Sequence, residues 1–487
     1  MRKIFNILLS GLFVLGTWSC SEDIMDDINK NVNDPTEVGS HLIITDAMVT
    51  SAFSVAGSDL AFYAGVYIEH SVGVWNQSYS AEIRSGEPTK STTYNNNWNA
   101  IYANLYNLKD VITKCDVGGS EEGNFHTLGI AQILSAYNLA VLTDLMGDVP
   151  WSEALQPGII YTPKLDKQED IYADIMKFLD DAIANLEKES TFAPLGVQDF
   201  IYKGGEGSEK SWLKFAYGLK ARYTMRLSHK TPNYAKVIEF ANLSFASAGE
   251  QAQFNYDGST TQSPFFRFFK DRDYLGASQS LHDKLVERSD PRDAEFFKPY
   301  PGTGTLEFAP NGTPKQSQGF YGISALSNIT APTYLLSYHE VEFLKAEAYV
   351  RQGGAANLAL AQTALRNAIS AAFQKENIGL TDDDAEGYFD DNVLGLFNAN
   401  PLQEVMNQKY IAFYEEEAVE AYNDYRRLMA MGDNVISLAN PKNAANLFPQ
   451  RFTYGASDVT TNANVRDAYG DGTYVYSEKV WWAGGTR

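Results

Sequence analysis

Apolar residues recur at three- and four-residue spacings along much of the chain, and the longest such run lies between residues 128 and 155. Its apolar positions are Ile130, Ile133, Leu134, Tyr137, Val141, Leu142 and Leu145. This spacing predicts a buried helix of about five turns. We expect it to end at Gly147 and Pro150, because glycine adopts the left-handed C-cap conformation and proline lacks an amide donor.

The same periodicity predicts further helices within residues 40–71, 95–114, 171–186, 212–227, 343–369 and 403–431. The glycine-rich turn at 118–123 would allow the helix at 95–114 to form an antiparallel pair with the opening helix. Gly353 and Gly354 would divide the segment 343–369 into a second pair of helices. Recurring helix pairs are typical of a tetratricopeptide-like scaffold, in which each pair is buried by its neighbours. We therefore predict an all-α, mainly helical fold with helical repeats over about 40–250 and 333–435.

Two stretches lose the helical period, residues 57–90 and residues 251–332. In the second, Gly, Pro, Ser and aromatic residues dominate, apart from a short helix expected near Ser280–Arg288. A long irregular insertion in a repetitive scaffold is more often functional than not. We therefore expect these two stretches to form a large loop-rich ligand-binding part.

The N-terminus has the pattern of a signal peptide over residues 1–19, with Arg2 and Lys3 before an apolar run. Cys20 follows this run directly, as in a lipidated lipoprotein. Residues 20–39 are rich in Asp, Glu and Asn and predict a tether. The domain that follows is expected to span 40–487.

Charge and cysteine content exclude some classes of protein. The chain has 39 basic and 61 acidic residues, and loss of Arg2 and Lys3 would leave a net charge of about −24. Such a surface repels phosphate backbones, so we expect no nucleic-acid partner. Besides Cys20 only Cys115 is present, which leaves no disulfide framework and indicates a small buried side chain.

No catalytic, cofactor or metal-binding motif accompanies the many carboxylates. We predict no enzyme activity, no catalytic residues, no cofactor and no metal site. The acidic and basic residues beside apolar stripes are expected to cap or pair helices: Asp144, Asp148, Glu153, Glu340, Glu342, Glu347, Glu420, Asp424, Arg426 and Arg427. The run Glu415–Glu417 is expected to be a solvated face.

Several motifs resemble those of the SusD/RagB family of nutrient-binding lipoproteins. They are LTDLMGDVPWSEA (142–154), SYHEVEFLKAEA (337–348), NQKYIAFYEEEAVEAYNDYRR (407–427), RFTYGASDVTTN (451–462) and KVWW (479–482). Gly455 and Asp458 replace the proline and glutamate of the fourth motif. The resemblance implies a lipid-anchored outer-membrane protein that faces the cell exterior. It also implies nutrient-glycan binding and a SusC-like TonB-dependent transporter as partner.

Aromatic side chains stack on the C–H faces of sugar rings, while amide and guanidinium groups bind the hydroxyls, and relatives in this family bind glycans in this way. The candidates in the loop-rich part are Trp75, Asn76, Tyr79, Arg84, Phe266, Arg267, Tyr274, Phe308 and Tyr321. Two alternatives stay open: an oligopeptide ligand, as in the RagB branch, and a transporter lid with little ligand affinity of its own.

Overall fold

The computed structural model describes residues 38–205 and 207–487. The chain divides into two units, residues 1–39 and residues 40–487. The predicted signal peptide, Cys20 and residues 20–37 of the predicted tether lie outside the described residues. The following paragraphs concern the second unit.

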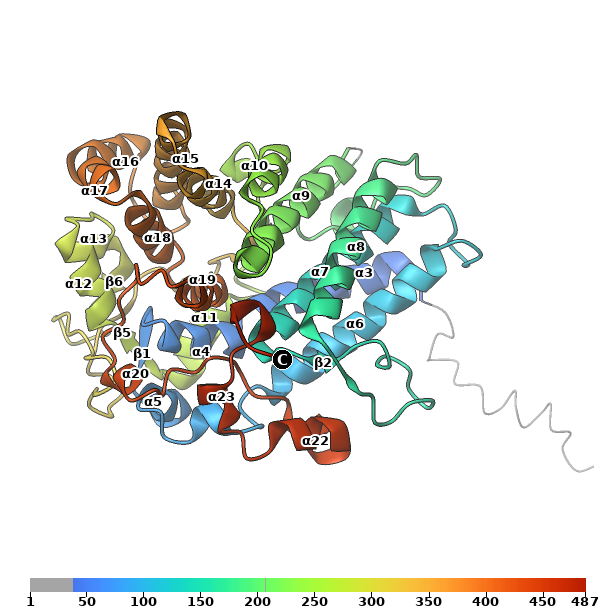
Figure 1. The fold of residues 1–487 in the computed structure, drawn as a ribbon, viewed down its shortest axis with the longest axis horizontal. Coiled ribbons are helices and arrows are strands. Elements are labelled where there is room, and N and C mark those ends of the chain that lie inside the picture. Colours follow the sequence, from blue (N-terminus) through green and yellow to red (C-terminus); the bar gives the residue numbers. More distant parts are fainter. Residues whose placement is uncertain (1–37, 206) are drawn as a thin grey trace, which may run out of the picture. The chain divides into compact units, whose positions relative to one another are not determined.

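The second unit is built on helices that lie side by side in a row, from α15 through α14, α10, α9, α8, α7 and α6 to α3 (Figure 1). Their bounds are α3 Ser40–Thr50, α6 Asn95–Cys115, α7 Phe125–Met146, α8 Gln168–Leu186, α9 Glu209–Arg226, α10 Tyr234–Leu243, α14 Tyr338–Gln352 and α15 Ala355–Phe373. Two more long helices, α18 Pro401–Ala412 and α19 Ala418–Met431, are separated by a break at 413–417. The predicted mainly helical, tetratricopeptide-like fold is confirmed.

Helix α7 lies within the row, between α6 and α8. Residues 127–146 are all buried, so the helix has no solvent-facing side. It ends at Gly147 as expected, and the Gly147 amide donates to the Thr143 carbonyl at 2.7 Å; with φ 75° and ψ −133°, however, Gly147 has a positive φ outside the left-handed helical conformation that was predicted. Among the described helices α7 alone has the length and apolar composition of a membrane span, and it is wholly buried within the protein.

The stretch 57–90, expected to be a loop, is largely helical. It contains α4 Asp59–Tyr67 and α5 Asn76–Glu82, and a π-helix, Ser51–Ala56, precedes α4. Helix α4 is buried on nearly every side, from Leu60 to Tyr67. Helix α4 lies within 40–71, where the spacing predicts a helix, so the two expectations overlap at 57–71 and the helical one holds for α4, whereas α5 was not predicted.

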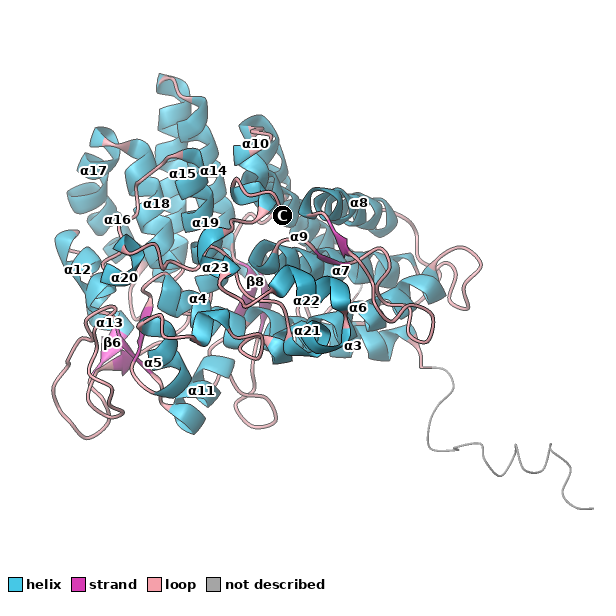
Figure 2. Ribbon diagram, turned by 60° about the horizontal axis from the view of Figure 1, so that its bottom comes forward, coloured by secondary structure: helices cyan, strands magenta, loops and turns pink. Residues whose placement is uncertain are grey.

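The stretch 251–332 is irregular as expected, but it contains more structure than the one helix predicted. The predicted helix is α12 Gln279–Glu287, and α11 Pro264–Arg272 and α13 Asp293–Phe296 were not predicted. Short antiparallel strand pairs lie among these helices (Figure 2): β1 Ser71–Gly73 with β5 Leu275–Ala277, β4 Ala252–Phe254 with β8 Thr333–Leu336, and β6 Phe297–Lys298 with β7 Ile323–Ser324.

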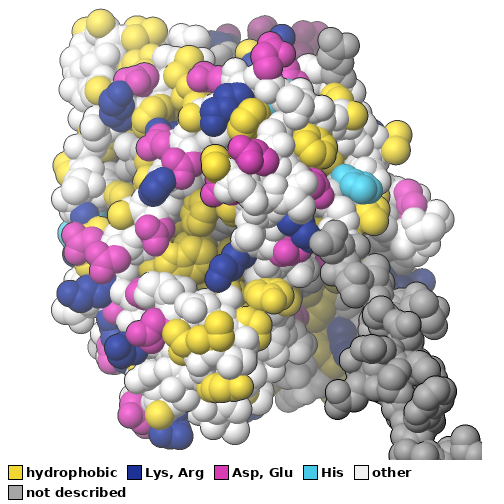
Figure 3. All heavy atoms as spheres, turned by 90° about the vertical axis from the view of Figure 1, so that its right-hand side faces the viewer, with side chains coloured by type: hydrophobic (Ala, Val, Ile, Leu, Met, Phe, Trp, Pro, Cys, Tyr) yellow, Lys and Arg dark blue, Asp and Glu magenta, His cyan; other side chains and the backbone are white. Residues whose placement is uncertain are grey.

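The remaining elements are short. They are β2 Val149–Pro150 paired with β3 Leu165–Asp166, and helices α16 Asp382–Tyr388, α17 Leu394–Ala399, α20 Pro441–Ala444, α21 Ala456–Thr461, α22 Ala463–Tyr469 and α23 Tyr474–Ser477. Cys115 is buried at the end of α6, as predicted. On the face shown in Figure 3, acidic and basic side chains are interspersed, so the acidic excess forms no single continuous patch there.

The charged residues of the motifs pair between helices inside the core. Arg427 and Glu347 make two bonds of 2.7 Å between α19 and α14. Arg222 of α9 donates to Glu340 of α14 at 2.7 Å, and Lys409 of α18 contacts Asp424 of α19 at 2.7 Å. The expectation of inter-helix pairs is confirmed for these residues.

We predict that Glu347→Ala lowers the free energy of unfolding by about 3–5 kcal/mol, because it leaves the buried Arg427 with less compensation for its charge. Equilibrium denaturation measures the change. The control is Lys236→Ala, which breaks an exposed pair with Glu239 and should cost under about 1 kcal/mol. Equal effects of the two variants would contradict a structural role for the buried pair.

Candidate functional site

Several predicted ligand-binding residues lie where β1 ends and β5 begins. The Val74 amide donates to the Tyr274 carbonyl at 2.8 Å, which extends the strand pairing by one residue, to the position directly before Trp75. The Asn76 side-chain amide donates to the Tyr274 hydroxyl at 2.9 Å. We call Trp75, Asn76, Tyr79 and Tyr274 the platform.

Local backbone geometry presents these platform residues. Trp75 is extended and half-buried, and α5 begins directly after it. Asn76 is exposed and has φ 48°, a left-handed conformation that asparagine tolerates better than most residues. Tyr79 lies three residues further on, which places it on the same face of α5. The Asn76 amide and the Tyr274 ring therefore meet at a partly exposed surface, with Trp75 and Tyr79 on the segment that carries Asn76.

Three other predicted residues are engaged in packing. Arg84 is buried, donates to the Ala81 carbonyl at 2.7 Å and lies over the Tyr67 ring. The Phe308 ring stacks on His282 with centroids 3.8 Å apart. Tyr321 is buried, and its hydroxyl accepts from the Lys315 amide at 2.8 Å. The structure does not bring these three side chains to the platform, and we leave them out of the proposed site.

The last two predicted residues, Phe266 and Arg267, lie on α11 and face different surroundings. Arg267 is exposed, pairs with Asp271 at 2.9 Å and borders a separate shallow groove beside Tyr256. Phe266 instead lines an enclosed pocket next to the platform. Phe268, also in this pocket, contacts Tyr274 with ring centroids 5.8 Å apart, which links pocket and platform.

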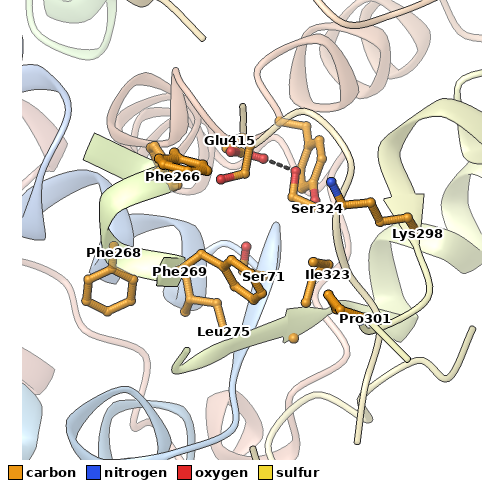
Figure 4. A pocket seen from close by; sticks show the side chains of 14 residues that line it. Ser71, Phe266, Phe268, Phe269, Leu275, Lys298, Pro301, Ile323, Ser324 and Glu415 are labelled. Atoms are coloured by element: carbon orange, nitrogen blue, oxygen red, sulfur yellow. Dashed lines mark hydrogen bonds between the residues drawn. The ribbon is translucent and has the colours of Figure 1, made fainter. Parts of the chain in front are cut away.

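This pocket, which we call the phenylalanine pocket, has a volume of about 160 Å³. Its walls come from α11, β1, β5, β7 and the turn before α19 (Figure 4). The lining residues are Ser71, Phe265, Phe266, Phe268, Phe269, Leu275, Gly276, Lys298, Pro301, Ile323, Ser324, Ser327, Tyr414 and Glu415. The lining is mostly apolar, with Lys298 and Pro301 exposed at the rim.

Helix α11 is fixed by its own sequence and by α4. Pro264 occupies the first turn, where its missing amide costs nothing, and Asp273 ends the helix with φ 54°. Phe62 of α4 packs against Phe265 and Phe268 with centroid distances of 4.8 and 4.2 Å. These contacts hold the phenylalanine wall in place.

The expectation that Glu415–Glu417 form a solvated face is wrong. Glu415, Glu416 and Glu417 are 3%, 7% and 4% exposed, respectively. Glu416 pairs with Lys375 at 2.8 Å, and Glu417 accepts a hydrogen bond from the Ser337 hydroxyl at 2.6 Å. The residues form the turn between two buried helices, so their side chains are enclosed by the helix array.

Glu415 points into the phenylalanine pocket (Figure 4). One carboxyl oxygen accepts from the Ser324 hydroxyl, and the other has no hydrogen-bond partner among the described residues. Burial, and then the nearby Glu416 carboxylate, raise the pKa of Glu415 to about 8, while Lys375 and Lys298 oppose the shift. The side chain is therefore an acid that retains its proton near neutral pH.

Sequence reasoning missed Phe269, Ser327 and Glu415 as site residues. A signal for Phe269 exists: the spacing of the phenylalanines in PFFRFF puts several on one side of a single turn. For Glu415 the signal is weaker, a glutamate run flanked by Tyr414 and Val419 in an otherwise apolar segment. Within 38–205 and 207–487, no group of three or more His, Cys, Asp or Glu side chains is placed to hold a metal ion.

Comparison with known protein families gives a match over residues 33–455 to a SusD-like family described as starch-binding and associating with the outer membrane. The match covers most of the chain, and the chain belongs to this family of binding proteins. Comparison with curated proteins gives no match.

Among solved structures, a SusD/RagB family protein from Bacteroides thetaiotaomicron is 45% identical, with a TM-score of 0.84 over 93% of this chain and 100% of the other. A chitin-binding SusD homologue from Flavobacterium johnsoniae is 20% identical, with a TM-score of 0.69 over 92% of this chain and 99% of the other. The second shares the fold.

We predict that Glu415 makes stability depend on pH. Its pKa is raised in the folded state, so the folded protein holds this proton more tightly than the unfolded chain and loses stability as pH rises from about 4.5 to about 8. Glu415→Gln removes this loss. Between pH 5 and pH 8 the Tm of the variant should therefore rise relative to the Tm of the wild type. Parallel Tm profiles would contradict the raised pKa.

Proposed function

We propose that this protein binds a nutrient oligosaccharide or polysaccharide at the platform and delivers it to a TonB-dependent transporter in the outer membrane. The observation that carries the proposal is the hydrogen bond between the Asn76 amide and the Tyr274 phenol at a partly exposed surface, directly after the half-buried Trp75 in the sequence. The family's description as starch-binding supports the same class of ligand.

The platform suits a sugar because a pyranose ring has both an apolar face and a rim of hydroxyls. Its C–H face can stack on Trp75 or Tyr79, and its hydroxyls need partners such as the exposed Asn76, Gln77 and Arg272 side chains. Each stacked face removes on the order of 100 Å² of apolar surface from water, a gain of roughly 2.5 kcal/mol. Association costs roughly 4 kcal/mol or more, so two or three stacked sugars give weak binding.

Weak binding fits a protein that passes its ligand onward. In this proposal the lipid on Cys20 anchors the protein to the outer membrane, facing the cell exterior, and the domain covers a SusC-like transporter. An α-helical array offers the large surface that such docking needs. The family's association with the outer membrane supports this location.

We expect Trp75→Ala to weaken glycan binding at least about tenfold, because one stacked ring face is lost. Isothermal calorimetry on the chain from Ser21 onward, with a panel of oligosaccharides, measures the effect. Tyr161→Ala is the matched control, since Tyr161 is 77% exposed and belongs to a different loop. Its affinity should equal that of the wild type.

The same panel tests the alternatives. Glycan binding that persists unchanged in Trp75→Ala and Tyr79→Ala would place the site elsewhere. Heat from a mixed peptide digest alone would favour an oligopeptide ligand. The absence of measurable heat with every ligand would favour a transporter lid with little ligand affinity of its own.

We predict that Cys20→Ala releases the protein from the membrane fraction, because a diacylated cysteine supplies the stable attachment. Fractionation of cells that lack the transporter measures the change, so that docking cannot retain the protein. The control is Cys115→Ala, whose thiol is buried and which should leave fractionation unaltered. Membrane association of the Cys20→Ala protein in these cells would refute lipid anchoring.

A further inference from the structure

The phenylalanine pocket differs in chemistry from the platform beside it. Its volume of about 160 Å³ is close to that of an engineered apolar cavity of about 150 Å³ that holds one benzene molecule. A sugar ring would bury several hydroxyls against an apolar lining that includes Phe266, Phe269 and Ile323, and most of these hydroxyls would be left without partners. The pocket therefore has the size and the walls for one aromatic ring.

In this apolar lining, two polar atoms have no hydrogen-bond partner within the part of the chain that the structure describes. One is the free carboxyl oxygen of Glu415, which is 3% exposed, and the other is the Ser327 hydroxyl. They come from segments far apart in sequence that line the same pocket. A buried polar atom without a partner costs about 1–3 kcal/mol, a cost that a ligand with one matching polar group would remove.

We propose that the phenylalanine pocket binds a phenol, an uncharged aromatic ring with a single hydroxyl. The ring fills the space between the phenylalanines, and the hydroxyl donates to Glu415 and accepts from Ser327. This site is separate from the proposed glycan platform and does not depend on it.

The charge around the pocket favours a phenol over an amine of the same size. Lys298 at the rim would repel an ammonium group. Glu415 holds its proton near neutral pH because it is buried, so it offers no full negative charge to a cation. A neutral hydroxyl meets neither obstacle.

The source of the phenol is either a tyrosine side chain in a peptide or an aromatic ester on a glycan. Both present the same ring and hydroxyl at the end of a chain that the open rim can admit. N-acetyltyrosinamide and methyl p-coumarate represent the two sources. Whichever binds more tightly identifies the source, and either result agrees with the proposal.

The test measures binding of phenol, toluene and benzylamine to the chain from Ser21 onward, by ligand-observed NMR and calorimetry at pH 7. We expect phenol to bind at least about fivefold more tightly than toluene, because only phenol satisfies the buried polar atoms. Equal binding of phenol and toluene, or tightest binding of benzylamine, would overturn the proposal.

Three variants locate the binding. Glu415→Leu should weaken the binding of phenol at least about tenfold, and Ser327→Ala should weaken it about threefold. The affinity for toluene should change little in either variant. Ile323→Trp should fill the pocket and abolish binding of every probe. Ser327→Ala keeps the test valid if Glu415→Leu fails to fold, and unchanged phenol binding in Ser327→Ala and Ile323→Trp would refute the assignment.

The outcome is distinct from that of the glycan proposal. Ile323→Trp alters the phenylalanine pocket and should leave glycan affinity at the wild-type value, whereas Trp75→Ala should reduce glycan affinity and leave phenol affinity in place. Loss of one activity without the other shows which proposal has failed.

Discussion

The structure depends most on the ion pairs that α19 makes inside the core. Arg427 binds Glu347 of α14, Asp424 binds Lys409 of α18, and Glu420 binds Arg226 of α9. Removing each charge from water costs several kcal/mol, which is recovered only when the pairs are well aligned. The three neighbouring helices can therefore pack on α19 in few ways, so the pairs set the register of the array.

This register determines what happens at the turn before α19. Because the turn is packed in the core together with α19, its three consecutive glutamates are buried, and each has different neighbours. Glu416 reaches Lys375, and Glu417 reaches His339 and Ser337. Glu415 has the left-handed φ of 72° and lies against the loop-rich part. The phenylalanine pocket thus has a rigid acidic floor supplied by the scaffold, while its walls come from the loop-rich part.

The parts of the fold that sequence predicts are those with local signals. Amphipathic spacing and glycine turns predict most long helices, and the motif charges predict the pairs between them. Helix α5 was not predicted because its seven residues, Asn76–Glu82, are too few to show a helical period. Helix α11 was not predicted because it has nine residues, too few to show a clear helical period within a stretch rich in Gly, Ser and Thr.

For the candidate site, the sequence indicates residue types but not the contacts between them. Trp75, Asn76 and Tyr274 could be proposed because aromatic and amide residues in an irregular stretch indicate sugar binding. Their contact could not be predicted, since Asn76 and Tyr274 are separated by 198 positions and meet through the pairing of β1 with β5. Glu415 was assigned to solvent because charge is normally exposed, and only tertiary packing reverses that rule.

The platform and the phenylalanine pocket would differ in the affinity and the selectivity with which each binds its part of a ligand. Stacking on a partly exposed surface is weak and tolerant, since many sugars share the same C–H face. An enclosed pocket with two unpaired polar atoms is selective, because a ligand lacking the matching hydroxyl leaves them unpaired. A ligand with both a sugar and a phenol would bind more tightly than either part alone, provided that its linker spans the distance between the two sites. Phe268 contacts Tyr274 and also lines the pocket, so that distance is short.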